Sequence, residues 1–353
     1  MGHLIDFNDL TFAEWKKIIS QAADIEKYTS RFSGALNGKI LGTLFYEPST
    51  RTQMSFKTAM YRLGGQIIGF SDSASTSGVK GESLTDTIRM VCSYADVIAI
   101  RHPKPGSAKA AAMAADCPVI NAGDGGHLHP TQTLTDLVTL NKKLGEVKNI
   151  TVGFCGDLKY GRTVHSLVKT LLYFDGIKFV FISTENLRIP EYLRGMLDAH
   201  NAVYRDVFSL DDAISSLDVL YMTRIQKERF SSHEDYIDQS GKYILNNKKL
   251  INAKKDMLIM HPLPRVDEIH PEVDSDGRAI YFEQAKCGVF ARMSLILHLL
   301  SAVKPVPHCP ENPADNLKCA NQDCITNHED NIPVSFRRFN DKSYCEYCEE
   351  EDF

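Results

Sequence analysis

The strongest constraint on the fold is a strict alternation of short apolar, β-branched segments with segments of helical periodicity. Strands are predicted at residues 39–46, 66–70, 96–100, 118–122, 150–155, 178–183, 218–223 and 257–261. Helices are predicted near residues 49–63, 82–95, 107–115, 131–144, 162–174, 190–200, 210–217 and 291–303. Such alternation is typical of parallel sheets covered by helices on both faces. We therefore predict an α/β protein with two doubly wound parallel-sheet domains.

Length and composition agree with this fold class and exclude several kinds of protein. The 353 residues exceed one ordinary core, and the composition, 43% hydrophobic and 24% charged, is that of a globular chain. A net charge of -5 gives the chain as a whole no attraction to nucleic acid or anionic membranes. The apolar runs fall short of a membrane span, and the acidic N-terminal segment is unlike a signal peptide. We expect a cytoplasmic protein without a membrane or nucleic-acid partner.

The predicted domains follow from the two strand series and from a change in composition near the end. The first domain consists of residues 1–132, and residues 287–304 return to it. The second domain consists of residues 133–286. The long predicted helix at 131–144 and the last helix join them. Residues 304–318 hold four prolines without periodicity and are predicted to be a linker. A small third domain is expected in residues 305–353, the linker included.

Polar clusters follow five of the predicted strands. They are Ser49–Thr52, Arg101–Pro103, residues 127–132, Arg224 with Gln226, and residues 261–265. Each cluster alone could be a set of solvated side chains. Parallel strands end at one edge of a sheet, however, and ligands of doubly wound folds bind there. Five clusters at such edges therefore indicate a binding or catalytic site.

The arginines among these clusters indicate an anionic ligand. Arg51, Arg101, Arg162 and Arg224 would repel one another in an empty cleft, and guanidinium groups match phosphate and carboxylate by paired hydrogen bonds. Ser49–Thr52 begin a predicted helix, whose free N–H groups favour an anion. The chain has no GxxxxGK[ST] motif, and residues 153–161 lack the GxGxxG spacing. These observations predict a metal-free site for small polyanions.

The motifs together resemble the catalytic chain of aspartate carbamoyltransferase. They are FYEPSTRTQMSF, IRHP, NAGDGGHLHPTQTLTDL, GDLKYGRTVHS, LYMTRIQKER and HPLPRVDEI, in order along residues 1–304. Ornithine carbamoyltransferases share the STRT and HPxQ elements but typically carry cysteine where this chain has Pro262. The resemblance implies transfer of the carbamoyl group from carbamoyl phosphate to the α-amine of L-aspartate, a reaction of pyrimidine biosynthesis.

The resemblance also implies roles for individual residues. The phosphate would be held by Ser49, Thr50, Arg51 and Thr52. The carbamoyl oxygen would accept hydrogen bonds from Thr52, Arg101 and His129, and Gln132 would hold the carbamoyl nitrogen. The aspartate would contact Arg162, Arg224, Gln226 and the backbone carbonyls of Leu263 and Pro264. Catalysis would be positional and electrostatic, without a cofactor or a protein nucleophile, and the phosphate itself could accept the proton.

A Ser- and Gly-rich loop at residues 73–83 is expected to serve a neighbouring subunit. The resemblance implies a homotrimer in which Ser77 and Lys80 reach into the adjacent active site. This loop is one residue shorter than the family pattern and has one lysine where relatives often have two. We assign Lys80 because Gly81 follows it. A solvated loop lysine is the alternative.

The last segment carries the spacing of a closed zinc site. Cys319 and Cys324 form one pair, and Cys345 and Cys348 form the other, about 20 residues away. The segment is short and polar, so metal binding would supply much of its folding free energy. It resembles the zinc domain of the aspartate carbamoyltransferase regulatory chain, without that chain's nucleotide-binding domain. We expect a structural zinc and a role in assembly, which could extend beyond the trimer. Cys309, beside His308 in the linker, is expected to be a spectator, although it could displace one of the four ligands.

Three other functions are compatible with parts of the sequence. A carbamoyltransferase could use a different amine acceptor. A ligand-binding or scaffold subunit could keep the fold without catalysis, although every expected site position holds a competent residue. A zinc-ribbon nucleic-acid binder is compatible with Arg337 and Arg338 but is opposed by the acidic CEEEDF end and by the net charge.

Overall fold

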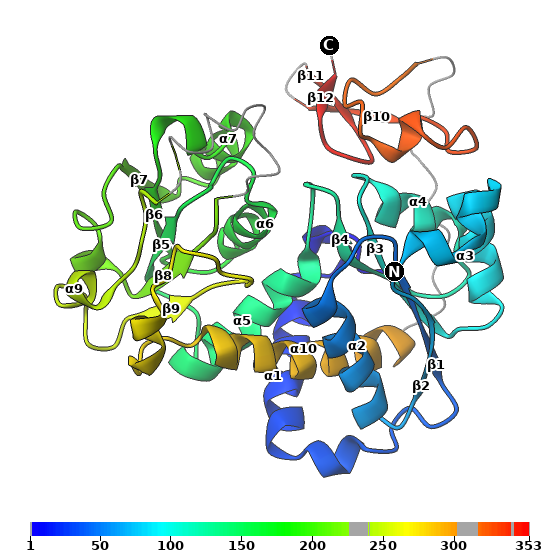
Figure 1. Ribbon diagram of the computed structural model, residues 1–353, viewed down its shortest axis with the longest axis horizontal. Helices are drawn as coiled ribbons and strands as arrows, with labels where there is room; N and C mark the ends of the chain where they lie inside the picture. The colour runs from blue at the N-terminus through cyan, green and yellow to red at the C-terminus, as the bar shows by residue number, and fades with distance from the viewer. Residues whose placement is uncertain (1, 226–238, 240, 302–316, 340–341, 353) are drawn as a thin grey trace. The chain divides into compact units, whose positions relative to one another are not determined.

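The computed structural model describes residues 2–225, 239, 241–301, 317–339 and 342–352. The chain divides into two compact units. Unit 1 consists of Met1–Leu134 and Gly288–Phe353, and unit 2 consists of Thr135–Cys287. Two long helices, α5 (Pro130–Leu144) and α10 (Tyr281–Ser301), contribute residues to both units. Each unit contains its own parallel sheet, which confirms the predicted fold class (Figure 1).

The sheet of unit 1 has four parallel strands in the order β2-β1-β3-β4. Its strands are β1 (Ile40–Phe45), β2 (Gln66–Phe70), β3 (Val97–His102) and β4 (Val119–Asp124). Its other helices are α1 (Phe12–Lys27), α2 (Thr50–Arg62), α3 (Leu84–Cys92) and α4 (Ser107–Ala114). β1, β3 and β4 are almost wholly buried, as their continuous apolar sequences require. The predicted face of α2 is also buried, through Phe56, Ala59 and Met60.

The sheet of unit 2 has five parallel strands in the order β7-β6-β5-β8-β9. Its strands are β5 (Thr151–Cys155), β6 (Lys178–Ile182), β7 (Val203–Val207), β8 (Val219–Met222) and β9 (Leu258–Met260). Its other helices are α6 (Arg162–Leu171), α7 (Glu191–Ala199) and α9 (Asn247–Leu250). Thr223, Asp157 and Gly156 pack together where β5 and β8 end, and a Cβ at Gly156 would lie 2.3 Å from the Thr223 carbonyl oxygen.

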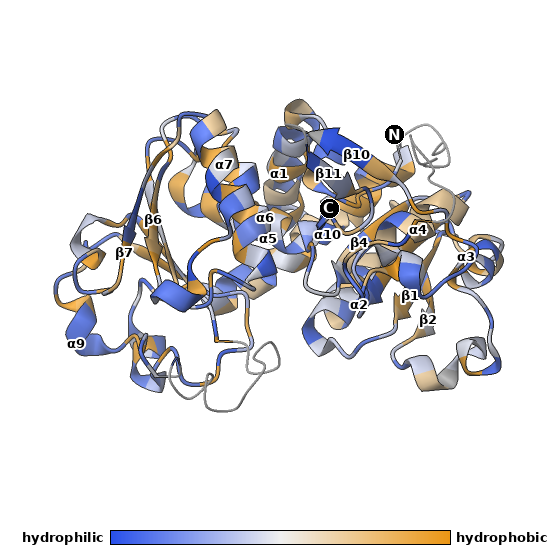
Figure 2. Ribbon diagram, turned by 90° about the horizontal axis from the view of Figure 1, so that it is seen from above, coloured by the Kyte–Doolittle hydropathy of each residue, from blue (hydrophilic) through white to orange (hydrophobic). Residues whose placement is uncertain are grey.

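Two predictions about unit 2 were wrong. The edge strand β7 was not predicted, because it is largely exposed and carries the adjacent charged residues Arg205 and Asp206 between apolar ones. Figure 2 shows it largely hydrophilic beside the hydrophobic β6. The predicted helix at residues 210–217 is only a short 3-10 helix, Ile214–Ser216. There Ser209 accepts a hydrogen bond from the Asp211 N–H, and Ser216 donates to the Ala213 carbonyl. Such local side-chain bonds compete with an α-helix.

The C-terminal segment forms a small antiparallel sheet in the order β10-β11-β12. Its strands are β10 (Phe336–Phe339), β11 (Lys342–Cys345) and β12 (Glu351–Asp352). Its buried side chains, among them Ile325 and Tyr347, pack in the same core as residues of β3 and α4. A Cβ at Gly106, which has a φ of 84°, would lie 2.6 Å from the Tyr347 Cβ. The small domain is therefore docked tightly on unit 1. No helix among the described residues is long and apolar enough to cross a bilayer.

Candidate active site

The carboxyl edge of the first sheet gathers the predicted residues of unit 1. Ser49–Thr52 follow β1, Arg101 is the last residue but one of β3, and His129 follows β4. Ser77 and Lys80 lie in the loop after β2, in a 3-10 helix that Gly81 ends with a φ of 89°. Because the strands are parallel neighbours, all four loops emerge at one edge. Ser77 and Lys80 are exposed there.

The segment Ser49–Thr52 forms the start of α2, as predicted. Ser49 is the N-cap residue, and its side chain makes no capping hydrogen bond within the described chain. The first turn holds Thr50, Arg51 and the buried Thr52. The helix thus begins with N–H groups that have no partner within the helix, beside hydroxyls and a guanidinium, an arrangement that suits an anion.

Arg101 is the most constrained cation of this edge. It forms an ion pair with Glu47, and its Nη1 donates to the Ala122 carbonyl over 3.3 Å. Among the described residues, no group accepts a hydrogen bond from its buried Nε. Burial lowers the pKa of Arg101, although Glu47 opposes the shift. Burial and the charge of Arg101 lower the pKa of Arg51. The two guanidinium groups therefore lie close enough to repel, and an anion between them would relieve both.

His129 is held at the start of α5. Its side chain is only 5% exposed, and its Nδ1 lies 3.4 Å from the Thr131 hydroxyl. Its carbonyl accepts a hydrogen bond from the Gln132 N–H over 2.9 Å. Arg292 of α10 lies 3.4 Å from the Thr131 hydroxyl and donates to the Gly288 carbonyl over 2.9 Å. These contacts fix the backbone that carries His129 and Gln132.

The carboxyl edge of the second sheet gathers the predicted residues of unit 2. Arg162 begins α6 after β5, and Arg224 follows β8, which pairs with β5. Leu263 and Pro264 follow β9, which pairs with β8. The peptide bond between them is cis, and the Leu263 N–H donates to His261 Nδ1 over 2.7 Å. The predicted residue Gln226 lies outside the described residues.

His261 and Glu268 form a buried support beneath this edge. His261 Nε2 lies 2.6 Å from a Glu268 oxygen, and both side chains are almost fully buried. Burial raises the pKa of Glu268, but the hydrogen bond and charge of His261 outweigh it, and the net shift is downward. The pair fixes the ring that receives the Leu263 N–H.

The four predicted metal ligands converge in the C-terminal domain. The Sγ atoms of Cys319, Cys324, Cys345 and Cys348 all lie within 4.8 Å of one another, and all four residues are buried. Sulfurs bound to one tetrahedral zinc at 2.3 Å would be separated by about 3.8 Å. The Thr326 hydroxyl donates to Cys324 Sγ over 3.3 Å, as an outer-shell partner of a thiolate would. This donor set fits zinc. The neighbouring candidates Cys309 and His308 lie outside the described residues.

Comparison with known proteins gives the family. Residues 2–142 match the model for the carbamoyl-P binding domain of aspartate/ornithine carbamoyltransferase, and residues 148–299 match that for the Asp/Orn binding domain. The aspartate carbamoyltransferase catalytic subunit of Clostridium acetobutylicum is 54% identical over 301 residues, covering 85% of this chain and 98% of that protein. The chain belongs to the aspartate carbamoyltransferases. This confirms the family and the activity implied by the motifs.

Solved structures agree with this carbamoyltransferase assignment. The catalytic subunit of M. jannaschii aspartate transcarbamoylase is 46% identical with a TM-score of 0.79, over 85% of this chain and 98% of that one. A Trypanosoma cruzi aspartate transcarbamoylase solved with carbamoyl phosphate and aspartate is 36% identical with a TM-score of 0.79, over 84% and 96%.

The carbamoyltransferase carries one further domain. Residues 314–352 match the metal binding domain of the aspartate carbamoyltransferase regulatory chain. One polypeptide thus joins a catalytic chain to a domain of the regulatory-chain type, as the sequence analysis expected.

Two residues near the candidate active site of this carbamoyltransferase were not predicted from the sequence. Arg292 looked like an ordinary position in the apolar last helix, yet it is buried and holds Thr131. A lone arginine between long apolar runs was the available signal. Asp124 was part of a quoted motif without a role, yet its buried carboxylate organises the turn before His129.

His102 gives a stability prediction for the carbamoyltransferase. Its Nδ1 accepts from the Lys104 N–H over 3.1 Å, and burial, aided by Lys104, lowers its pKa to about 4. As the pH falls below about 6.5, the unfolded chain binds a proton at His102 that the folded chain does not bind until about pH 4. The free energy of unfolding therefore decreases as the pH is lowered through this range. Between pH 7.5 and 5.5 we expect wild type to lose about 1 kcal/mol more unfolding free energy than His102→Asn. Urea titrations of zinc-loaded protein would measure this, and equal losses would contradict it.

Proposed function

We propose that the two sheet edges divide the substrates between them. Unit 1 binds carbamoyl phosphate at the carboxyl edge of its sheet, and unit 2 binds L-aspartate at the carboxyl edge of its own. The α-amine of aspartate attacks the carbamoyl carbon, and phosphate leaves. The proximity of Arg51 to Arg101 carries this proposal, because two partly buried guanidiniums that repel each other beside a helix N-terminus favour a compact anion.

The phosphate and carbamoyl contacts are assigned to residues of unit 1. Ser49, Thr50, Arg51 and Thr52 bind the phosphate through hydroxyls, the guanidinium and the N–H groups that begin α2. Thr52, Arg101 and His129 donate to the carbonyl oxygen, on which negative charge develops in the tetrahedral transition state. The buried Nε of Arg101 supplies a donor of this kind. Gln132 binds the carbamoyl nitrogen.

The aspartate contacts are assigned to residues of unit 2. Arg162, Arg224 and Gln226 bind the two carboxylates, for which guanidinium forks are suited. The carbonyls of Leu263 and Pro264 orient the amine. The reaction needs no protein nucleophile, since binding aligns the amine with the carbamoyl carbon and the departing phosphate accepts the proton.

A product assay tests the proposed acceptor. Purified protein would be incubated with carbamoyl phosphate and either aspartate or ornithine, with and without CTP or ATP. We expect N-carbamoyl-L-aspartate and at least about 100-fold lower kcat/KM with ornithine, because a cationic side chain would replace the second carboxylate that the arginines are proposed to bind. Carbamoylation of ornithine or of another amine in preference to aspartate would overturn the assignment, and so would an inactive, fully folded protein.

We further propose a homotrimer in which Ser77 and Lys80 complete the site of a neighbouring subunit. Support comes from the exposed loop that carries both residues at the carboxyl edge of the first sheet. Lys80 would contact both substrates there. The C-terminal domain would bind a structural zinc and contribute to assembly, which could extend beyond the trimer. Cytoplasmic location stays a prediction.

Complementation tests the shared site. Lys80→Ala and Arg51→Ala chains should each be nearly inactive, because each removes a cation that faces the departing phosphate. Mixed and reassembled, the two variants should recover activity, since some sites in hybrid trimers receive a wild-type Lys80 and a wild-type Arg51. Arg89→Ala, on the exposed face of α3, serves as the mixing control. Hybrids that form, as shown by mass, without any recovery would sink the shared-site proposal.

A further inference from the structure

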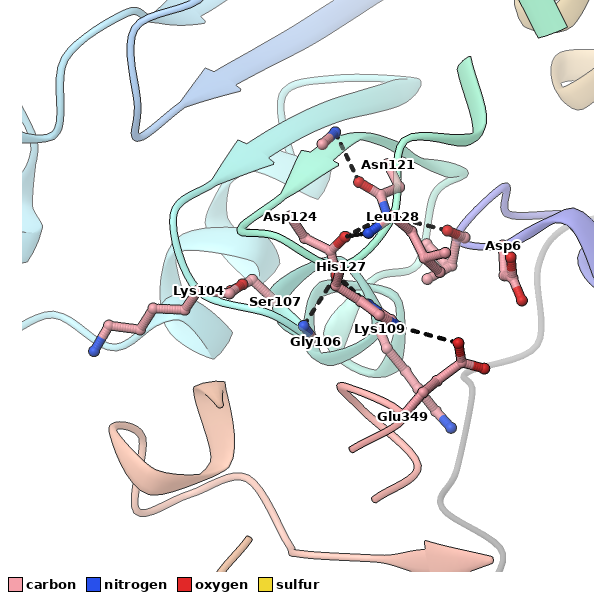
Figure 3. Close-up of polar contacts among 12 residues, drawn as sticks. Asp6, Lys104, Gly106, Ser107, Lys109, Asn121, Asp124, His127, Leu128 and Glu349 are labelled. Atoms are coloured by element: carbon pink, nitrogen blue, oxygen red, sulfur yellow. Dashed lines mark hydrogen bonds and ion pairs between the residues drawn. The ribbon is translucent and has the colours of Figure 1, made fainter. Parts of the chain in front are cut away.

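A buried histidine joins the C-terminal domain to the loop that carries His129. His127 Nε2 lies 3.3 Å from a carboxylate oxygen of Glu349, and its Nδ1 lies 3.1 Å from a carboxylate oxygen of Asp124 (Figure 3). Glu349 directly follows Cys348 of the predicted zinc site, whereas Asp124 ends β4. The imidazole therefore bridges two carboxylates that are 225 positions apart in the chain.

Asp124 connects this bridge to the active-site backbone. One of its oxygens accepts hydrogen bonds from the Leu128 N–H over 3.1 Å and from the Asn121 amide over 3.0 Å. The other accepts from the Gly106 N–H over 2.9 Å as well as from His127. The carboxylate is 2% exposed. It thus fixes the turn from β4 to Leu128, and the next residue is His129.

The charges at the bridge favour a doubly donating imidazolium. Burial alone would lower the pKa of His127, but Asp124 and then Glu349 outweigh burial and raise the pKa to about 10. Both ring nitrogens then carry protons, and each donates to one carboxylate. A neutral ring could donate to only one of them.

The surrounding contacts hold the C-terminal domain against the same region. Lys109 of α4 donates to the Glu346 carbonyl over 2.9 Å and pairs with the Glu346 carboxylate over 3.2 Å. The Ile325 N–H donates to the Pro105 carbonyl over 3.0 Å. Glu329 accepts from the Leu84 N–H at the start of α3 over 3.1 Å. The contact of Glu349 with His127 leads through the imidazole into the turn before His129.

We propose that His127 is a positioning residue through which docking of the C-terminal domain holds His129 in place for carbamoyl transfer. This inference rests on the proposed role of His129. When Glu349 is absent, the imidazole loses one of its two anchors, and the turn that it shares with Asp124 gains freedom. The phosphate contacts at the start of α2 are supplied by a different loop and stay intact. The cost therefore falls on the chemical step more than on substrate binding.

The test uses full-length, zinc-loaded protein with single and double variants. His127→Gln and Glu349→Gln each remove one side of the contact. We expect each to lower kcat about tenfold while KM for carbamoyl phosphate changes less than about twofold. The double variant should be no slower than either single variant, because both act through one contact. Zinc content and melting temperature would be measured for every variant.

Two controls separate the bridge from neighbouring charges. Glu351→Gln removes another carboxylate of the same small sheet, which pairs with Lys342 over 2.9 Å. Arg337→Gln removes another partner of Glu349, because the Arg337 Nη2 donates to a Glu349 carboxylate oxygen over 2.6 Å. Both should keep wild-type kcat.

The outcomes distinguish this inference from the proposed function. An inactive wild type would overturn both. An active wild type with unchanged kcat in His127→Gln and Glu349→Gln would overturn the bridge alone, as would losses that multiply in the double variant. A rise in KM for carbamoyl phosphate with kcat unchanged would also overturn it. If Glu349→Gln loses zinc, His127→Gln decides, because it lies on the other side of the contact.

Discussion

Replacement of Arg101 by alanine is expected to lower kcat by about 10³-fold. The side chain combines a buried Nε without a described acceptor, an ion pair with Glu47 and a repulsive neighbour in Arg51. A donor fixed in this way stabilises the charge that develops on the carbonyl oxygen, and loss of one such donor typically costs 10²–10³ in rate. Steady-state kinetics with saturating aspartate would measure the effect.

Matched variants would show that the loss belongs to the site. Arg101→Lys keeps the charge without the planar fork, so it should recover only part of kcat. Arg89→Ala removes an exposed arginine from α3 and should behave as wild type. Substantial activity of Arg101→Ala, with a wild-type melting curve, would contradict the proposed role.

Removal of zinc is expected to unfold the C-terminal domain. Four buried thiolates would repel one another without a cation, and the three short strands enclose little apolar area of their own. Structural zinc in comparable small domains contributes about 10–16 kcal/mol of apparent binding free energy at pH 7. Chelation, or Cys345→Ser, should therefore abolish the fold of residues 317–352 and change the oligomer mass.

The transferase reaction should survive this treatment at a reduced rate, because none of the proposed substrate contacts lies in the C-terminal domain. Zinc content by atomic absorption, mass by light scattering and melting by calorimetry would follow the change. Unchanged mass and melting after verified zinc loss would refute a structural metal. Cys92→Ser, which alters a half-buried cysteine outside the cluster, is the control for thiol substitution.

The fold was predictable where burial leaves a simple pattern. Strands such as β5 and β8 are buried on both faces and read as continuous apolar runs. β7 carries Arg205 and Asp206 at an edge, so its sequence resembles that of a loop. The segment 210–217 had helical composition, but the side chains of Ser209 and Ser216 bind its backbone instead. Propensity alone could not decide between these arrangements.

The candidate site was predictable where neighbouring residues share one task. The sequence pattern of Ser49–Thr52 predicts an anion site, and the spacing of the paired cysteines predicts a zinc site. The structure brings the four cysteine sulfurs together. The supports of the site came from distant parts of the chain. Arg292 reaches Thr131, and Glu349 reaches His127, through contacts that exist only after folding. A single sequence carries no signal of such pairs.

The docking of the C-terminal domain on its own chain determines how the contact responds to dilution of the protein. A regulatory domain on a separate polypeptide would dissociate as the protein concentration falls. Here the covalent link sets an effective concentration that does not depend on the amount of protein, typically on the order of millimolar for modules joined in one chain. The contacts at Gly106, Lys109 and His127 are therefore formed in a fixed one-to-one ratio with each catalytic domain. They should persist at the nanomolar concentrations of an enzyme assay.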